Sequence, residues 1–152
     1  MNIWLAAFAA VLAQPLVFLL RLAPAYFASP GPMHGIGFLL VAVVAVAAAV
    51  VLLLGVPVFL LLRRFHRDTW GWLALTGALL GGALAAFSWP RKLEGYSAGH
   101  TWYGRYVETY VDGIPTMYAW LSYGESVLFF ALHGLIGAVV FYAMLRRRER
   151  PN

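Results

Sequence analysis

Residues 35–62 decide the fold and read GIGFLLVAVVAVAAAVVLLLGVPVFLLL, without a single Asp, Glu, Lys or Arg. An α-helix needs about 20 consecutive apolar residues to cross the hydrocarbon core of a bilayer, which is about 30 Å thick. Residues 35–62 exceed that length. They therefore predict a helix that spans a membrane.

Three further apolar stretches occupy most of the remaining chain. Residues 70–89 and 126–145 are also free of acidic and basic side chains, and residues 3–27 contain only Arg21. Of the 152 residues 62% are hydrophobic and 11% are charged, which is far from the composition of a soluble domain. We predict an all-α integral membrane four-helix bundle, one domain covering residues 1–152, with spans at about 3–27, 36–62, 69–89 and 116–145.

Two arginine clusters predict the topology. Arg63, Arg64 and Arg67 follow the second apolar stretch, and four arginines lie within residues 146–150 after the last one. Cytoplasmic segments of membrane proteins are enriched in Lys and Arg, so both clusters should be cytoplasmic. We expect cytoplasmic termini, an external turn at residues 29–32 and one long external loop at about 88–122. An uncleaved first helix is favoured over a signal peptide, because no basic residue precedes Trp4.

The composition argues against several classes of function. The chain contains no cysteine, which excludes disulfides, thiolate catalysis and cysteine-bound metals. The net charge is +5, but the predicted external loop contains equal numbers of acidic and basic residues, so we expect no nucleic-acid partner. Hydrolase, nucleotide-binding and metalloprotease motifs are missing. We therefore expect no enzymatic activity, no cofactor and no metal site.

Small residues recur at four-residue spacing in two predicted spans. Gly77, Gly81 and Ala85 form such a row in the third span, and Gly134 and Ala138 form a shorter one in the fourth. Small side chains let the backbones of membrane helices approach closely. We expect these rows to pack the helices of one chain together, with a homo-oligomer contact as the alternative.

Proline residues interrupt two of the apolar stretches. Pro15 and Pro24 lie in the first and Pro57 in the second, and each lacks the amide hydrogen that a regular helix needs. Membrane helices tolerate such positions by bending. We expect the bend of the second span at the sequence Gly55-Val56-Pro57.

Aromatic residues crowd the predicted external loop. Trp and Tyr at span ends commonly anchor helices at the headgroup level, but residues 102–110 lie far from either adjoining span. Exposed Trp and Tyr are also enriched at protein–protein interfaces. We predict that the partner-binding residues are Trp102, Tyr103, Tyr106 and Tyr110.

Two local structures compete for the end of this loop. Asp112-Gly113 between two apolar runs is typical of a β-hairpin turn, whereas Pro115 is typical of the first turn of a helix. We favour a long fourth helix that begins near Pro115, because proline weakens a strand.

Four polar or ionisable side chains lie within the predicted spans: Gln14, Arg21, Glu125 and His133. Arg21 and Glu125 both lie near the external ends of their spans, where they can form an ion pair that serves either assembly or an ion pathway. His133 lies near the middle of the bilayer. Of interhelical hydrogen bonding, a proton relay and haem ligation we favour the first, because the other three histidines lie at or beyond span ends.

In its size, number of spans and lack of catalytic motifs, the chain resembles the small polytopic immunity proteins of bacteria. These proteins guard the inner membrane against pore-forming or periplasm-acting toxins delivered by contact-dependent secretion systems. The resemblance concerns the architecture of the whole chain, so it assigns no role to any residue. It implies a multi-pass protein of the bacterial inner membrane whose partners are the lipid bilayer and a protein toxin.

Two other hypotheses stand beside immunity. One is an accessory subunit of a larger membrane complex, docked through the row of Gly77, Gly81 and Ala85. The other is a small proton-coupled carrier or channel that uses Glu125 and His133.

Overall fold

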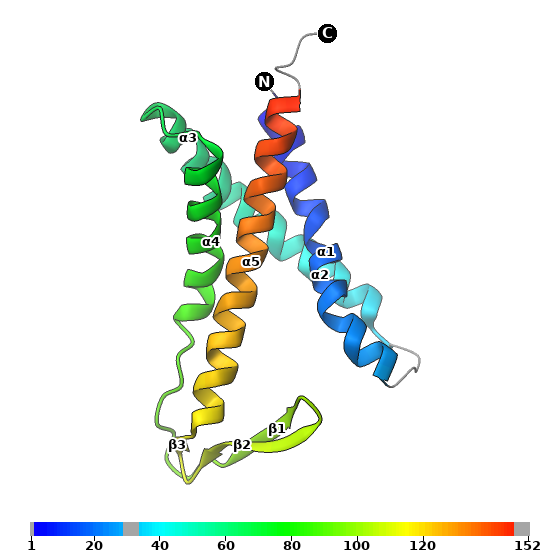
Figure 1. Cartoon of the computed structure of the whole chain (residues 1–152), viewed down its shortest axis with the longest axis vertical. Coiled ribbons are helices and arrows are strands. Elements are labelled where there is room, and N and C mark those ends of the chain that lie inside the picture. The colour runs from blue at the N-terminus through cyan, green and yellow to red at the C-terminus, as the bar shows by residue number, and fades with distance from the viewer. Residues whose placement is uncertain (1, 29–33, 148–152) are drawn as a thin grey trace.

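The computed structural model describes residues 2–28 and 34–147, which are mostly helical and include one small sheet (Figure 1). The predicted turn at residues 29–32 and the arginines at 148 and 150 lie outside the described residues. The elements are α1 (Ile3–Ala28), α2 (Ile36–Val50), the π-helical turn η1 (Val51–Gly55), α3 (Val56–Arg64), α4 (Trp70–Ala86), β1 (Ala98–Trp102), β2 (Arg105–Val111), β3 (Ile114–Pro115) and α5 (Met117–Arg147).

Three helical segments are long and apolar enough to cross a membrane: Ile3–Ala23 within α1, Ile36–Arg64 and Met117–Arg147. The third predicted span, α4, is a shorter apolar helix of 17 residues. At 1.5 Å per residue it is about 25 Å long. It ends at Ala86 and not at Trp89, because Pro90 disfavours a helical conformation in the residue that precedes it.

The second span is helical throughout but irregular in its middle. The turn η1 occupies Val51–Gly55, directly before Pro57, at the place where the sequence predicts a bend. Proline cannot donate the next helical hydrogen bond, and a widened π-helical turn accommodates that missing bond. In contrast, α1 continues as one helix through Pro15.

The prediction of an all-α fold is wrong, because residues 98–115 form a three-stranded antiparallel sheet with the order β1-β2-β3. Tyr103-Gly104 connects β1 to β2, and Asp112-Gly113 connects β2 to β3. All four turn residues have positive φ, at 46°, 79°, 48° and 78°. Two successive positive φ values are typical of type I′ turns, which match the twist of the strands that they join.

The structure contains both local structures that were considered for the end of the loop. Asp112-Gly113 forms the hairpin turn, and the long helix begins at Met117, two residues after Pro115. Pro115 pairs with Tyr110 as the last residue of the short edge strand β3. Proline is tolerated there because an edge strand has one side without ladder hydrogen bonds. Helix α5 starts at Met117, and the carbonyl of Thr116 accepts hydrogen bonds from the amides of Ala119 and Trp120.

The rows of small residues pack α4 against α5. A methyl group added at Gly77 would lie 2.5 Å from the carbonyl oxygen of Gly134 and 2.6 Å from the Cβ of Ala138. One added at Gly81 would overlap the carbonyl oxygen of Phe130. These glycines therefore bring two backbones of the same chain into direct contact, as membrane helices with small residues do.

Buried contacts that join α1, α3, α4 and α5 gather at the end that carries Arg63, Arg64, Arg146 and Arg147. The buried cluster there is built around Phe59, whose ring packs edge-on against Phe141 at a centroid distance of 5.0 Å. Toward the sheet, the α1–α2 pair diverges from the α4–α5 pair (Figure 1). The two helix pairs therefore contact each other at the end opposite the sheet and separate toward it. The other members of this buried cluster are Ala6, Ala7, Ala10, Val56, Leu73 and Leu145.

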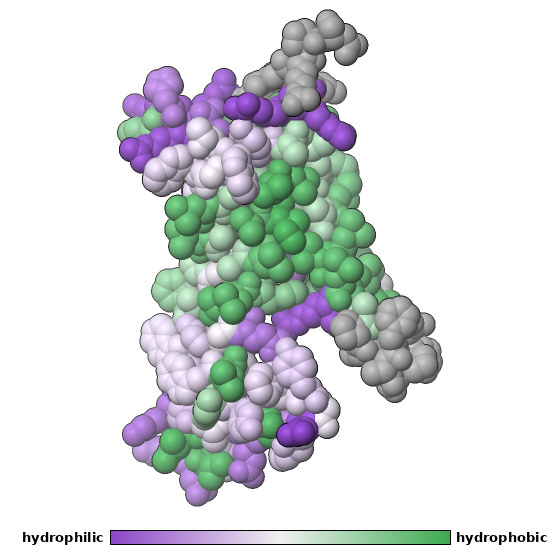
Figure 2. All heavy atoms as spheres, in the orientation of Figure 1, coloured by the Kyte–Doolittle hydropathy of each residue, from purple (hydrophilic) through white to green (hydrophobic). Residues whose placement is uncertain are grey.

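Figure 2 shows a broad apolar band around the middle of the molecule, between two more polar ends. The ends of α3 and α5 bear Arg63, Arg64, Arg146 and Arg147, and both lie at the end opposite the sheet. Helix α5 has 31 residues, about 46 Å at 1.5 Å per residue. It is therefore longer than a bilayer core requires, and its first turns support the sheet.

Candidate functional site

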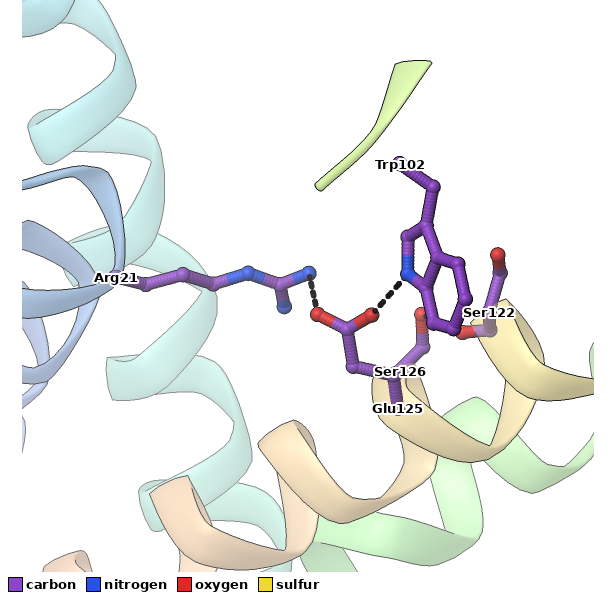
Figure 3. Close-up of polar contacts among 5 residues, drawn as sticks. All are labelled: Arg21, Trp102, Ser122, Glu125 and Ser126. Carbon is purple, nitrogen blue, oxygen red and sulfur yellow. Dashed lines mark hydrogen bonds and ion pairs between the residues drawn. The ribbon is translucent and has the colours of Figure 1, made fainter. Parts of the chain in front are cut away.

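Glu125 joins three elements that are far apart in the sequence. Its Oε1 lies 3.4 Å from Nη2 of Arg21 on α1, and its Oε2 accepts a hydrogen bond of 3.1 Å from the indole Nε1 of Trp102 on β1 (Figure 3). The predicted ion pair between Arg21 and Glu125 is therefore present. The bond from Trp102 was not predicted, because nothing in the sequence indicates how the hairpin folds back onto α5.

The Arg21 side chain makes a second contact with α5. Its guanidinium carbon lies 4.1 Å from the centroid of the Phe129 ring, one helical turn along from Glu125. The side chains of Arg21 and Glu125 are 41% and 39% exposed, so solvent screens the ion pair and limits its contribution to stability to about 1 kcal/mol or less. The geometry indicates a partly exposed contact that connects α1 to α5, and not a buried ion-binding site.

Trp102 fixes the hairpin to the start of α5. It is half-buried, and its ring packs edge-on against Tyr118 of α5 at 5.6 Å and against Tyr103 at 5.1 Å. Edge-on packing of aromatic rings adds stabilisation beyond the burial of area. Tyr110 is also half-buried and packs edge-on against Tyr96 at 5.3 Å. These two predicted partner-binding residues therefore attach the sheet to neighbouring segments.

Tyr103 and Tyr106 are the exposed members of the predicted set, with exposed fractions of 82% and 71%. Tyr103 occupies the first position of the turn between β1 and β2. Tyr106 crosses β1 at Gly99, where an added methyl group would lie 2.6 Å from the Tyr106 hydroxyl oxygen. The structure thus presents two exposed tyrosines on the β1–β2 hairpin, which Trp102 attaches to α5.

The polar groups of the spans form a hydrogen-bonded contact between α1 and α5. Gln14 is 7% exposed, and its amide nitrogen donates to the carbonyl oxygens of His133 and Ala10, each at 3.3 Å. His133 Nδ1 lies 3.0 Å from the carbonyl oxygen of Phe129, one turn earlier in the same helix. Interhelical hydrogen bonding, the favoured prediction, therefore involves the backbone of His133 and not its ring.

Within residues 2–28 and 34–147, no hydrogen bond or ion pair joins His133 to Glu125, and no group of three or more His, Asp or Glu side chains is placed to bind a metal ion. The remaining predicted packing residues lie where α4 faces α5. Ala138 contacts the position of Gly77, and Ala85 lines a cavity between the helices.

Comparison with known proteins finds no matching family model, no matching curated protein and no matching solved structure. Function is therefore inferred from the geometry of this chain.

Proposed function

We propose that the chain is a bacterial inner-membrane protein with four spans and cytoplasmic termini that presents its hairpin outside to a protein partner. The location of Arg63, Arg64, Arg146 and Arg147 at the end opposite the sheet supports this topology. In that orientation, the tip of the β1–β2 hairpin faces the periplasm.

The observation that carries the proposal is the pair of exposed tyrosines on a braced hairpin. Tyr103 and Tyr106 are mostly exposed, while Trp102 is tied to Glu125 and Tyr118. Tyrosines on a rigid support lose little conformational freedom when they bind, which favours a protein interface. We further propose that the partner is an antibacterial toxin, as the resemblance to small polytopic immunity proteins suggests.

The alternative of an accessory subunit needs a different docking surface from the one predicted. Gly77 and Gly81 face α5, and no space remains there even for a methyl group. A neighbouring subunit therefore cannot reach this row unless α4 and α5 separate. The carrier hypothesis also loses support, because the His133 ring bonds within its own helix and Glu125 bonds to Arg21 and Trp102.

The test is affinity purification of the tagged protein from native membranes in mild detergent, followed by mass spectrometry of the proteins that remain bound. The variant Tyr103→Ala/Tyr106→Ala should lose the partner. The control Trp89→Ala/Trp120→Ala removes two exposed aromatic residues outside the hairpin and should retain it.

Each result bears on the proposal in a defined way. Loss of a secreted partner with the tyrosine variant alone supports toxin neutralisation. Recovery of the same proteins with all variants contradicts the hairpin as the recognition surface. Stoichiometric recovery of other membrane proteins, independent of the tyrosines, favours an accessory subunit.

A further inference from the structure

The small sheet has two edges, and they differ in how the chain protects them. At one edge, strand β3 is two residues long, contains Pro115 and leads directly into α5. The turn beside this edge is also bonded to an earlier segment, because the Leu93 amide donates to the Gly113 carbonyl oxygen and the Gly113 amide donates to that of Tyr96. Proline and very short strands prevent a further strand from pairing at an edge. The β3 edge is therefore closed.

Strand β1 forms the opposite edge, and the two-residue turn Tyr103-Gly104 sets the direction of its backbone groups. The residues that flank such a turn, here Trp102 and Arg105, form a hydrogen-bonded pair. Hydrogen-bonded pairs in an antiparallel ladder alternate with pairs that are not hydrogen-bonded, and the next pair is Thr101 with Tyr106. The amide and carbonyl groups of Thr101 therefore point away from β2.

The backbone of Gly99 has the same direction. The carbonyl of Ala98 faces β2, because it accepts a hydrogen bond of 3.0 Å from Thr109 Oγ1. The two sides of a trans peptide plane point in opposite directions, so the amide of Gly99 faces outward. Within the described part of the chain, no backbone hydrogen bond from another segment reaches Gly99 or Thr101. Strand β1 contains neither proline nor lysine, which commonly protect such edges.

The exposed tyrosines lie beside this open edge. Tyr106 faces Thr101 across the ladder, and its hydroxyl oxygen lies over Gly99, at 2.6 Å from the position of a methyl group added there. Tyr103 follows β1 directly in the turn. An extended polypeptide presents amide and carbonyl groups at the two-residue spacing that separates Gly99 from Thr101. Such a segment can bond to the edge while its side chains contact the tyrosines.

We propose that the protein partner donates an extended segment of about five residues, which pairs with β1 (five residues) as a further strand of the sheet. This binding mode rests on the proposed presentation of the hairpin to a protein partner. A second copy of the chain fits less well, because pairing of β1 with β1 joins five residues on each side, whereas stable interfaces contain about 20–30. A separate partner can cover Tyr103 and Tyr106 together with the edge.

The labelled peptide RYVETYV tests the edge without the partner, by fluorescence anisotropy with the purified full chain in detergent. The peptide has the sequence of β2, and β2 itself occupies the inner side of β1, so only the open edge remains for it. Thr101→Pro removes the outward amide hydrogen and should weaken peptide binding by at least about fivefold, the effect of one lost hydrogen bond. The matched variant Thr101→Val keeps that amide and should bind like the wild type.

Two further measurements separate a lost edge from a lost fold. His100→Pro removes an amide that the register directs toward β2, so it should speed limited proteolysis of the sheet, whereas Thr101→Pro should not. In the wild type, saturating peptide should slow hydrogen exchange of residues 98–102. Failure of the wild type to bind the peptide, unchanged exchange, or equal binding by Thr101→Pro and Thr101→Val would overturn the proposal.

Purification of the partner distinguishes this binding mode from the proposed function. Loss of the partner with Thr101→Pro and with Tyr103→Ala/Tyr106→Ala supports both. Retention with Thr101→Pro but loss with the tyrosine variant overturns the strand pairing and leaves the hairpin as the recognition surface. Retention with both variants overturns both. A dimer of the purified chain that Thr101→Pro dissociates would overturn the proposal in favour of a second copy.

Discussion

At the scale of single residues, Glu125 decides how the sheet is attached to the helices. One of its oxygens accepts a hydrogen bond from the Trp102 indole, and the other faces the Arg21 guanidinium. The two contacts differ in kind. The ion pair is screened by solvent at about 40% exposure of both side chains, whereas the indole bond tethers a half-buried ring.

Variants of Glu125 separate these two contacts. Glu125→Gln removes the ion pair but keeps an acceptor for Trp102, so we expect it to lower the free energy of unfolding by at most about 1 kcal/mol. Glu125→Ala removes both contacts and should lower it by about 1–2 kcal/mol more. Titration of the detergent-solubilised protein with SDS, followed by circular dichroism, measures the difference. Equal stability of the two variants would contradict a role for the indole bond.

At the scale of elements, α4 and α5 form the closest helix pair, and glycine sets their separation. Gly77 and Gly81 of α4 lie directly on backbone atoms of α5. A side chain at either position cannot be accommodated by a change of rotamer, because the atoms that it meets belong to the backbone. Packing of this pair is therefore more sensitive to added volume than packing of side chain against side chain.

Substitution of Gly81 tests this pairing. We expect Gly81→Ala to destabilise the protein by about 3 kcal/mol or more, because the new methyl group overlaps the Phe130 carbonyl oxygen. The matched control is Gly71→Ala in the first turn of the same helix, where nothing lies within 4 Å. It should be neutral or stabilising by up to about 1 kcal/mol, because alanine favours a helix. SDS titration measures both, and a Gly81→Ala variant as stable as the control would refute the close contact.

The two hairpin turns make a second prediction at this scale. Gly104 and Gly113 both have positive φ, but only Gly113 lies against another segment, the backbone of Leu93 and Glu94. Gly104→Ala should cost about 1–2 kcal/mol, which is the strain of a left-handed backbone with a side chain. Gly113→Ala should cost distinctly more. Limited proteolysis of the external segment measures the loosening of the sheet, and equal cleavage rates for the two variants would contradict the packing of Leu93 on the second turn.

At the scale of the whole molecule, the arginine pairs that end α3 and α5 lie at the end opposite the sheet. The proposed orientation places the arginines in the cytoplasm and the sheet outside. The chain has no cysteine, so a single introduced thiol reports its side of the membrane without background.

Labelling of intact cells with a membrane-impermeant maleimide tests this orientation. Thr101→Cys, at an exposed position of β1, should react in intact cells. Asp68→Cys, in the loop between α3 and α4, should react only after the membrane is permeabilised. The reverse pattern would invert the proposed topology. Labelling of both positions in intact cells would show that α4, which lies between them, does not cross the membrane.

The sequence by itself determined the helices and the order in which they occur. Their signal is a run of apolar residues, and each run is a local property that needs no knowledge of its neighbours. The glycine row on α4 and the predicted depths of Arg21, Glu125 and His133 followed from helical geometry alone. The ends of the helices were predicted to within three residues, and the largest difference is the end of α4 at Ala86 instead of residue 89.

Only the tertiary structure decided which groups meet. The turn at Tyr103-Gly104 went unnoticed because tyrosine is not a typical residue at positive φ, although the glycine beside it is a usable signal. Among the four predicted partner-binding residues, Trp102 and Tyr110 pack against neighbouring segments, whereas Tyr103 and Tyr106 are exposed. This division depends on how the hairpin folds onto α5. Arg21 and Glu125 are 104 positions apart, and only the packing of α1 against α5 brings them together. Such features are set by long-range packing, because no single stretch of sequence contains both sides of a contact.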